Sequence, residues 1–416
     1  MPSATSICKT ILPNGIRILT EQVPYVESSS IGIWANVGSR DEDDSRRGIS
    51  HFIEHMLFKG TNTRNAWQIA DEMDYLGGHL NAFTDKEHTC FYVKVLSEHS
   101  DKALDILCDM VLNSVLDQEE MDREKNVVIE EIKRHRDTPE ELVHDLIPEV
   151  AWRGHRLGNS VIGLEEVILG LTHDDLAQFM QEFYRPDAMV VCAAGNVDHD
   201  RFVDLVTARF SNLTGKRTVR QLDDICVAPG RQMLSRATEQ VHFCMGTRGY
   251  TVSDSRKYAL ATVDCVLGGG MSSRLFQEIR EKRGLAYSVG SYAVSYQDNG
   301  MFVVFGGTSR SSLDEVLELV NKECKDIAEN SITSAELERA RNQIRSSIVL
   351  AQESMSNRMS RLAKNEICYG RIFSMEEVIR EMTMVTQDDV AQVADSLLKP
   401  DAFSLVAVGD FAAEEE

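Results

Sequence analysis

The sequence lacks any apolar run close to the roughly 20 residues that a membrane-spanning helix needs. Its start, "MPSATSICKTILPNG", has neither the hydrophobic segment of a signal peptide nor the arginine-rich character of a transit peptide. Basic residues are also few, since 44 Lys and Arg stand against 66 Asp and Glu, giving a formal net charge of −22. This balance disfavours nucleic acid as a partner and would attract cationic partners, but solubility is the favoured explanation of the charge. We therefore expect a cytoplasmic protein that binds neither membranes nor nucleic acid.

Cysteine pairs of the C-x-x-C type are absent as well. The nine cysteines are scattered along the chain, so neither a disulfide framework nor a thiolate zinc site is indicated. Only 8 prolines occur, and with 43% hydrophobic and 26% charged residues the composition is typical of a folded protein. A chain of 416 residues exceeds the size at which one core usually stops growing, which favours two domains.

What the chain does contain is an internal repeat. "THDDLAQFMQEFYRPDAMVVCAAG" at 172–195 matches "TQDDVAQVADSLLKPDAFSLVAVG" at 386–409 without a gap, at a constant offset of 214. Each copy has a threonine cap followed by acidic residues, an amphipathic helix, a Pro-Asp turn and an apolar strand that ends at glycine. We therefore predict two homologous domains, 1–215 and 235–416, joined by a polar linker with Gly and Pro at 216–234.

Strands and helices are grouped along each half rather than strictly alternating. The patterns predict strands at 8–22, 29–38, 78–96, 237–247 and 285–308, and helices at 46–58, 65–76, 98–153, 254–268, 272–283 and from 312 onward. This order predicts an α+β fold used twice, in which each domain is a mixed, mainly antiparallel sheet flanked by helices.

The segment "GISHFIEHMLFKG" at 48–60 contains the densest set of chemically active residues. His51 and His55 are four apart, so on a helix they share one face and can bind one ion, with Glu54 beside them. His-x-x-Glu-His is the inverted zincin motif, in which the glutamate takes a proton from water that zinc activates for attack on a peptide carbonyl. The alternative is a histidine pair with a purely structural role on an amphipathic helix.

A weaker match between the two halves, at an offset of 210, bears on whether the fold requires the cluster of His51, Glu54 and His55. The second half has no histidine pair there, because the equivalent residues are Ala261, Asp264 and Cys265. A duplicated domain that keeps the cluster in one copy argues that the fold does not require it.

A catalytic zinc with two histidine ligands usually takes a third protein ligand, most often a carboxylate. "MDREKNVVIEEIKRHRD" at 121–137 reads as a helix in which Glu124 and Glu131 are seven apart on one face. Composition alone would assign both glutamates to a solvated face, so the residues by themselves leave the third ligand open.

With these motifs the whole chain resembles the pitrilysin/insulinase family of zinc peptidases, specifically the half-length branch of the mitochondrial processing peptidase beta subunit and its bacterial relatives. In that family the third ligand follows the second histidine by 76 residues, which is Glu131 here. The resemblance implies one Zn²⁺ per chain held by His51, His55 and Glu131, with Glu54 as the base. It implies a supporting role for Glu124.

Two further segments resemble substrate-binding parts of the family. "GGHLNAFTDKEHTCFYVKVL" at 77–96 is similar to the edge strand that pairs with an extended peptide, which implies backbone contacts at Asn81, Ala82 and Phe83. From sequence alone, an ordinary β-hairpin is the favoured interpretation of this segment.

"LGGGMSSRLFQEIREKRGLAYSVGSY" at 267–292 resembles the segment whose arginine and tyrosine, seven apart, hold the substrate carbonyl and backbone; here they are Arg280 and Tyr287. Without the resemblance, Arg280 would be one charge on a basic helix face and Tyr287 a strand residue of the core.

Because full-length family members hold this pair in the second half of a chain about twice as long, a half-length chain should obtain it from a partner. We therefore expect a two-fold homodimer that encloses a chamber, with Arg280 and Tyr287 acting in trans. The expected activity is zinc-dependent hydrolysis of peptides or unfolded polypeptides. The alternatives are a non-catalytic subunit and one subunit of an obligate heterodimer of the processing-peptidase type.

Overall fold

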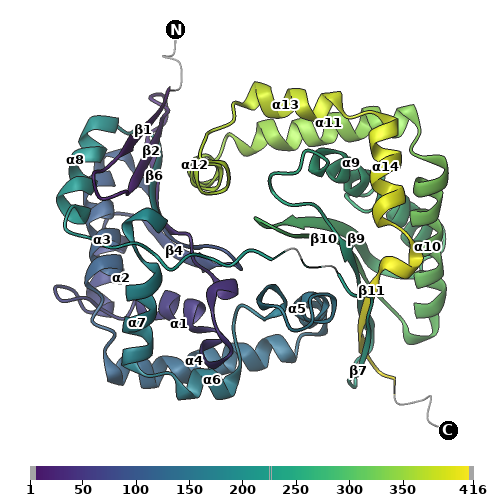
Figure 1. Cartoon of the computed structure of the whole chain (residues 1–416), viewed down its shortest axis with the longest axis horizontal. Helices are drawn as coiled ribbons and strands as arrows, with labels where there is room; N and C mark the ends of the chain where they lie inside the picture. The colour runs from purple at the N-terminus through teal and green to yellow at the C-terminus, as the bar shows by residue number, and fades with distance from the viewer. Residues whose placement is uncertain (1–5, 224, 226, 412–416) are drawn as a thin grey trace. The chain divides into compact units, whose positions relative to one another are not determined.

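The computed structural model of the protein describes residues 6–223, 225 and 227–411 (Figure 1). Its contacts divide the chain into two compact units. The first contains the chain up to Ile132, Ser160–Arg220 and Leu350–Ile372, and the second contains Lys133–Asn159, Gln221–Val349 and the chain from Phe373. These units differ from the contiguous halves expected from the repeat, because each includes a segment of the other half.

The first unit is built on a six-stranded sheet with the order β1-β2-β6-β3-β5-β4. The strands β2 and β6 are parallel, and the other neighbours are antiparallel. Strand bounds are β1 Ser6–Ile11, β2 Arg17–Gln22, β3 Ser28–Ala35, β4 His79–Thr84, β5 Thr89–Leu96 and β6 Met189–Gly195. The predicted strands at 8–22 and 78–96 are thus each a hairpin of two strands.

Helices of the first half cover one face of this sheet. They bury one hydrophobic cluster against it that includes Ile31, Ile33, Phe52, Phe91, Leu107, Phe179 and Val206. The helices of this unit from the first half are α1 Ile49–Met56, α2 Ala66–Tyr75, α3 Ser100–Asn113, α4 Gln118–Arg136 up to Ile132, α6 Glu165–Gly170, α7 His173–Phe183 and α8 His199–Phe210.

The other face of the first sheet is covered by a helix from the second half of the chain, α12 Met355–Tyr369 (Figure 1). Its side chains share a buried cluster with the sheet that contains Leu19, Trp34, Val190, Met359, Leu362 and Ala363. Two buried glutamates add ion pairs to this packing, since Glu366 of α12 binds Lys9 at 2.7 Å and Glu21 of β2 binds Arg361 at 2.9 Å. The helix is therefore an integral layer of the first unit.

The second unit repeats this plan with a five-stranded sheet of order β7-β11-β8-β10-β9. Its β7–β11 pair is parallel and the other neighbours are antiparallel, so the order matches β2-β6-β3-β5-β4 of the first sheet. The bounds are β7 Arg231–Ser235, β8 Val241–Arg248, β9 Ala286–Ser295, β10 Gly300–Thr308 and β11 Ser404–Gly409. The predicted duplicated fold of mixed, mainly antiparallel sheets is confirmed, although β7 begins inside the expected linker.

A helix from the first half, α5 Pro139–Ala151, covers one face of the second sheet. Its cluster includes Val143, Ile147, Trp152, Cys244, Met301 and Val406. The opposite cluster draws on α9 Lys257–Leu267, α10 Leu313–Asn330, α11 Ser334–Ala351 and α14 Gln387–Leu397; α13 Met375–Met384 completes the helices. The two halves of the chain thus exchange one helix each, which explains why the compact units are not contiguous.

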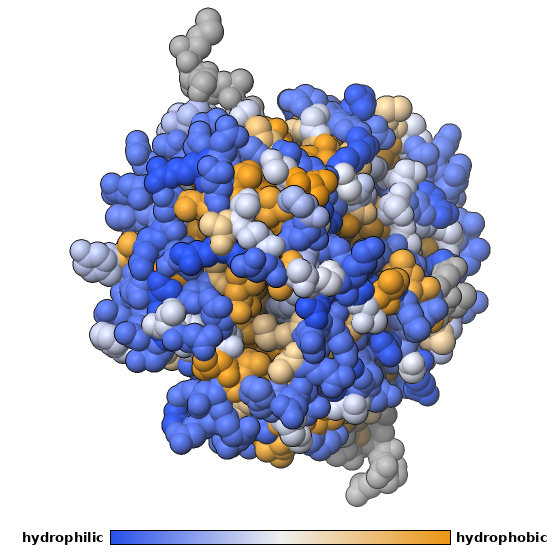
Figure 2. Space-filling model, turned by 60° about the vertical axis from the view of Figure 1, so that its left-hand side comes forward, coloured by the Kyte–Doolittle hydropathy of each residue, from blue (hydrophilic) through white to orange (hydrophobic). Residues whose placement is uncertain are grey.

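The surface of the protein is mainly polar on one face. On the face shown in Figure 2 the exposed residues are mostly hydrophilic, with hydrophobic residues in smaller groups. Within the described residues, no helix is long and apolar enough to cross a membrane. The eight described cysteines are free thiols, and five of them, Cys90, Cys108, Cys192, Cys244 and Cys324, are buried.

Candidate metal centre

Helix α1 carries the histidine pair because its other face is apolar. Ile49, Phe52, Ile53 and Met56 recur at helical spacing and are all fully buried in the first unit. This packing fixes the rotation of the helix about its axis and presents the remaining face, with His51 and His55, toward α4.

The structure brings together the three residues expected to bind zinc. One ligand atom from each of His51, His55 and Glu131 lies within 4.8 Å of the other two, the kind of group that could hold a metal ion. Glu131 Oε2 is 3.7 Å from His51 Nε2 and 3.6 Å from His55 Nε2. Two ligands of one tetrahedral zinc stand roughly 3.3 Å apart, so only small side-chain adjustments separate this arrangement from a bound geometry.

Glu124 lies behind His55 and determines which nitrogen of the ring carries a hydrogen. Its Oε1 accepts a hydrogen bond of 2.8 Å from His55 Nδ1, and its Oε2 is 2.5 Å from Lys59 Nζ. Burial alone would raise the pKa of Glu124, but the bonds from His55 and Lys59 outweigh burial and hold the pKa below its ordinary value. With Nδ1 donating to a carboxylate, His55 Nε2 keeps its lone pair for a metal.

Lys59 was not singled out from the sequence. Lys59 follows the end of α1 at Met56 by three residues, so the helical spacing of the motif gave no signal for it.

Glu54 lies between the two histidines in sequence and points to the neighbouring edge strand. Its Oε2 accepts a hydrogen bond of 2.5 Å from Thr84 Oγ1 at the end of β4. Burial and the charge of Glu131 raise the pKa of Glu54 above its ordinary value, against the opposing effects of Thr84 and His55. A carboxylate with a raised pKa is a better proton acceptor near neutral pH. Thr84, like Lys59, was missed by the sequence analysis.

The second unit keeps the scaffold of this arrangement without its metal ligands. Asp264 on α9, at the position equivalent to Glu54, accepts a hydrogen bond of 2.5 Å from Ser291 Oγ on the edge strand β9. Burial raises the pKa of Asp264 to about 6. Cys265 takes the place of His55 and donates to Gln343 Oε1 at 2.9 Å. A helix carboxylate bonded to an edge-strand hydroxyl is therefore common to both halves, and only the first half adds the histidines.

The predicted substrate residues Asn81, Ala82 and Phe83 lie on β4, which is the last strand of the first sheet and pairs only with β5. The hairpin closes with Asp85 N donating to His88 O at 2.8 Å. Since hydrogen-bonded and non-hydrogen-bonded pairs alternate in an antiparallel ladder, the main-chain groups of Leu80, Ala82 and Thr84 point away from β5.

One of these outward groups is already engaged, because Ala82 N donates to Asn81 Oδ1 at 2.8 Å. The sheet thus ends in a partly free edge beside the residue pair Glu54 and Thr84.

Arg280 and Tyr287 belong to the second unit, in contrast to the His–His–Glu group of the first. Arg280 lies in a short π-helix, η6 Phe276–Glu281, within the predicted helix at 272–283. Its guanidinium carbon is 4.7 Å from the ring centre of Phe276 and 4.8 Å from that of Tyr287, so it is held between two aromatic faces. Tyr287 is 77% exposed on β9, which contradicts the alternative of a core tyrosine.

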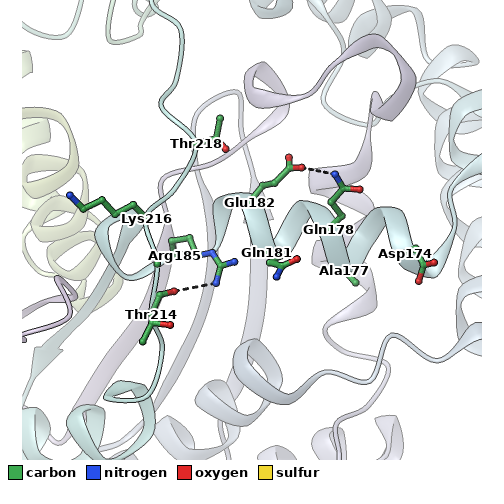
Figure 3. A pocket seen from close by; sticks show the side chains of 10 residues that line it. Asp174, Ala177, Gln178, Gln181, Glu182, Arg185, Thr214, Lys216 and Thr218 are labelled. Atoms are coloured by element: carbon green, nitrogen blue, oxygen red, sulfur yellow. Dashed lines mark hydrogen bonds between the residues drawn. The ribbon is translucent and has the colours of Figure 1, made fainter.

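A hollow of about 1080 Å³ on the first unit contains none of the predicted site residues. It lies between α7 and the segment 214–218, and Figure 3 shows hydrogen bonds across its lining from Gln178 to Glu182 and from Arg185 to the Thr214 carbonyl. Both bonds are at exposed positions, so the hollow is a solvated groove.

Comparisons with known proteins cover nearly the whole chain. Residues 17–165 match the family model described as insulinase (peptidase family M16), and residues 170–344 match the one described as the peptidase M16 inactive domain. A Bacillus subtilis protein described as the uncharacterized zinc protease YmxG is 42% identical over 395 residues, which cover 95% of this chain and 96% of that protein. A Streptomyces coelicolor protein, also described as an uncharacterized zinc protease, is 40% identical over 94% of this chain and 87% of its own.

Solved structures give the same fold at lower identity. A protease from Helicobacter pylori superimposes with a TM-score of 0.89 at 21% identity and covers 97% of this chain and 100% of that one. A Pseudomonas fluorescens structure described as a peptidase M16 inactive domain gives a TM-score of 0.92 at 18% identity, with 99% of both chains covered.

Proposed function

This chain belongs to the insulinase family of peptidases, M16, and on that premise we propose that it is a zinc-dependent endopeptidase that hydrolyses peptides or unfolded polypeptides. The observation that carries the proposal is the convergence of His51, His55 and Glu131, whose ligand atoms all lie within 4.8 Å of one another. Glu54 lies in the same helix as the two histidines and would serve as the base.

Each residue of the site has a defined task in this reaction. His51, His55 and Glu131 would hold one zinc ion, which when bound acts as a Lewis acid on the peptide carbonyl and on water. Glu54 takes a proton from the attacking water and returns it to the departing amine, and the hydrogen bond from Thr84 orients its carboxylate. Glu124 keeps the hydrogen of His55 on Nδ1.

The free edge of β4 supports an extended substrate. Outward main-chain groups at Leu80, Ala82 and Thr84 can pair with a peptide as an added strand, which selects polypeptides without stable structure of their own. For such a strand to pair fully, the Asn81 side chain must release Ala82 N. The substrate's scissile bond would then lie next to Glu54, because Thr84 at the end of the same strand contacts Glu54.

Arg280 and Tyr287 complete the proposed site from the other subunit of a homodimer that encloses a chamber. Support comes from the stacked, exposed geometry of the pair, which leaves the Tyr287 hydroxyl available to a substrate. Mixing Glu54→Gln with Arg280→Ala subunits tests the proposal, since each heterodimer should regain about one intact site. Activity of the mixture no higher than that of either variant alone would exclude action in trans.

The competing proposal is that the chain does not cleave peptides by itself. It would then be either a structural subunit or one subunit of an obligate heterodimer. The match of residues 170–344 to an inactive-domain model is expected for both readings, because that segment contains none of the three proposed metal ligands. The complete His–His–Glu group with Glu54 and Glu124 in place favours the enzyme. If the purified chain binds zinc yet cleaves no fluorogenic peptide, the heterodimeric reading gains the advantage.

The decisive experiment is metal analysis of the purified wild type beside Glu131→Gln, with peptide cleavage measured on both. We expect about one zinc per wild-type chain with activity, and loss of both in the variant. Glu130→Gln, the same change one residue earlier in α4, is the matched control and should retain zinc. A wild-type chain that contains no transition metal and binds none when supplied with it would refute the proposed function.

A further inference from the structure

The helix that carries the histidine pair cannot cap its own N-terminus. Gly48, which precedes Ile49, has φ +96, and a Cβ there would stand 2.8 Å from the Gly163 Cα and 2.9 Å from the Ile162 carbonyl oxygen. The position is therefore restricted to glycine, and the serine, threonine, aspartate or asparagine that usually caps a helix cannot occupy it. The main-chain N–H groups of the first turn need an acceptor from elsewhere.

Glu42, six residues before Gly48, supplies that acceptor. Its Oε2 accepts from Gly48 N at 2.7 Å and its Oε1 accepts from Ser50 N at 2.9 Å. The side chain is completely buried, so water does not compete for these two N–H groups. Ser50 directly precedes His51, which places the second of these bonds one residue from an expected metal ligand.

The loop that carries Glu42 is itself fixed by buried ion pairs of the first unit. Arg220 donates to both oxygens of Asp41, at 2.8 Å from Nε and 2.6 Å from Nη2, and Gly38 N donates to the same carboxylate at 3.0 Å. Arg40 pairs with Glu87 at 2.5 Å. Because its neighbours on the loop are held in this way, Glu42 offers α1 a fixed anchor rather than a flexible side chain.

We propose that Glu42 is a positioning residue for the metal centre: by capping α1 it fixes where His51, and one turn later His55, present their rings. This inference rests on the proposed zinc site for its function, but its structural part concerns α1 alone. Loosening the first turn makes the His51 ring sample more orientations, so binding a metal must then order it. The consequence is weaker metal binding by a protein that is still folded.

The capping role does not depend on the charge of Glu42. Burial and the neighbouring Asp41 raise the pKa of Glu42 to about 8, against the bonds from Gly48 and Ser50. A carboxyl group has two oxygens that can accept in either protonation state, whereas a glutamine amide has one. Glu42→Gln therefore removes one acceptor and turns an N–H donor toward another N–H, with almost no change in volume.

The test compares Glu42→Gln with Asp198→Asn, the same carboxylate-to-amide change at the cap of α8, where Asp198 Oδ1 accepts from Arg201 N at 2.9 Å. The first readout is the zinc Kd, measured by competition with a chromogenic chelator. We expect Glu42→Gln to raise the Kd about tenfold, while Asp198→Asn stays within twofold of wild type. Glu42→Asp, which keeps the carboxyl group on a shorter side chain, should also raise it.

The second readout needs no metal: amide hydrogen exchange of residues 48–56 in the metal-free proteins. Exchange there should be faster in Glu42→Gln and unchanged in Asp198→Asn. Helix α8 should exchange as in wild type in both variants, because asparagine keeps the one oxygen that accepts from Arg201 N. A Glu42→Gln Kd within twofold of wild type, or unaltered exchange over 48–56, would overturn the inference. If the wild type bound no zinc, the proposed function would fail, and the exchange measurement would still decide whether Glu42 caps α1.

Discussion

The support that Glu124 gives to His55 leads to a quantitative prediction. In Glu124→Gln one carboxylate oxygen becomes an NH₂ group, yet both partners, His55 Nδ1 at 2.8 Å and Lys59 Nζ at 2.5 Å, are donors. If the amide oxygen stays with Lys59, His55 must move its hydrogen to Nε2, the atom that would bind zinc. If it stays with His55, the ammonium of Lys59 loses its partner. Partners of this kind contribute 10–100-fold to metal affinity, which corresponds to about 1.4–2.7 kcal/mol.

The assay is the zinc Kd from chelator competition, with peptide cleavage at saturating zinc as a second measurement. Glu119→Gln is the matched control, since Glu119 lies on the same helix with its side chain 83% exposed. Lys59→Met keeps the His55 bond and should weaken zinc less than Glu124→Gln does. A Kd for Glu124→Gln within twofold of wild type would refute the reasoning that the tautomer of His55 is set by this carboxylate.

Three further predictions concern stability, pH and substrate charge. Met359→Ala on α12 removes a side chain that is 1% exposed and accepts from Trp34 Nε1 at 3.2 Å, so it should lower the free energy of unfolding in urea by about 2–5 kcal/mol. Met384→Ala, at a 65% exposed position, is the control and should lower it little. Equal losses in the two variants would contradict the packing of α12. The pKa of Glu42 is raised to about 8 in the folded protein, so the contribution of Glu42 to the free energy of unfolding is full below about pH 4.5 and is lost as the pH rises through 8. Between pH 5 and 8.5 the free energy of unfolding of the wild type should therefore fall by at least about 1 kcal/mol more than that of Glu42→Gln. Parallel pH profiles of the two proteins would contradict this prediction. With a net charge of −22, the proposed enzyme should cleave a basic peptide faster than its acidic counterpart at low salt and lose that preference at high salt, and equal rates at low salt would argue against electrostatic selection.

The sequence predicted most of the local elements and the position of the histidine pair on one helix. The spacing of His51 and His55 predicted that both lie on one face of a helix, and α1 contains both residues. Glu131 came only from the family resemblance, because spacing along α4 could not distinguish it from solvated glutamates. The structure supplies the missing information by placing its Oε2 within 3.7 Å of both imidazoles.

What the sequence could not predict are contacts between segments distant along the chain. Thr84 and Glu42 are ordinary polar residues until the fold places one beside Glu54 and the other at the start of α1. The amphipathic pattern of α12 likewise predicts an apolar face but not the sheet it covers. The short strand β7 was not predicted either, because its five residues, at an edge of the sheet where the pairing is parallel, show no alternation of apolar and polar side chains.

The exchange of helices between the two halves has a consequence for biosynthesis. The strand of the first sheet that is synthesised last, β6, ends at Gly195. The helix that covers the second face of this sheet, α12, begins only at Met355, some 160 residues later. At translation rates of about 5–20 residues per second, a ribosome needs roughly 8–30 seconds to bridge that interval. Throughout this time the first unit of the nascent chain exposes the hydrophobic surface around Leu19, Trp34 and Val190. The protein therefore matures in one late step rather than domain by domain, and a chain truncated before α12 should depend on chaperones to stay in solution.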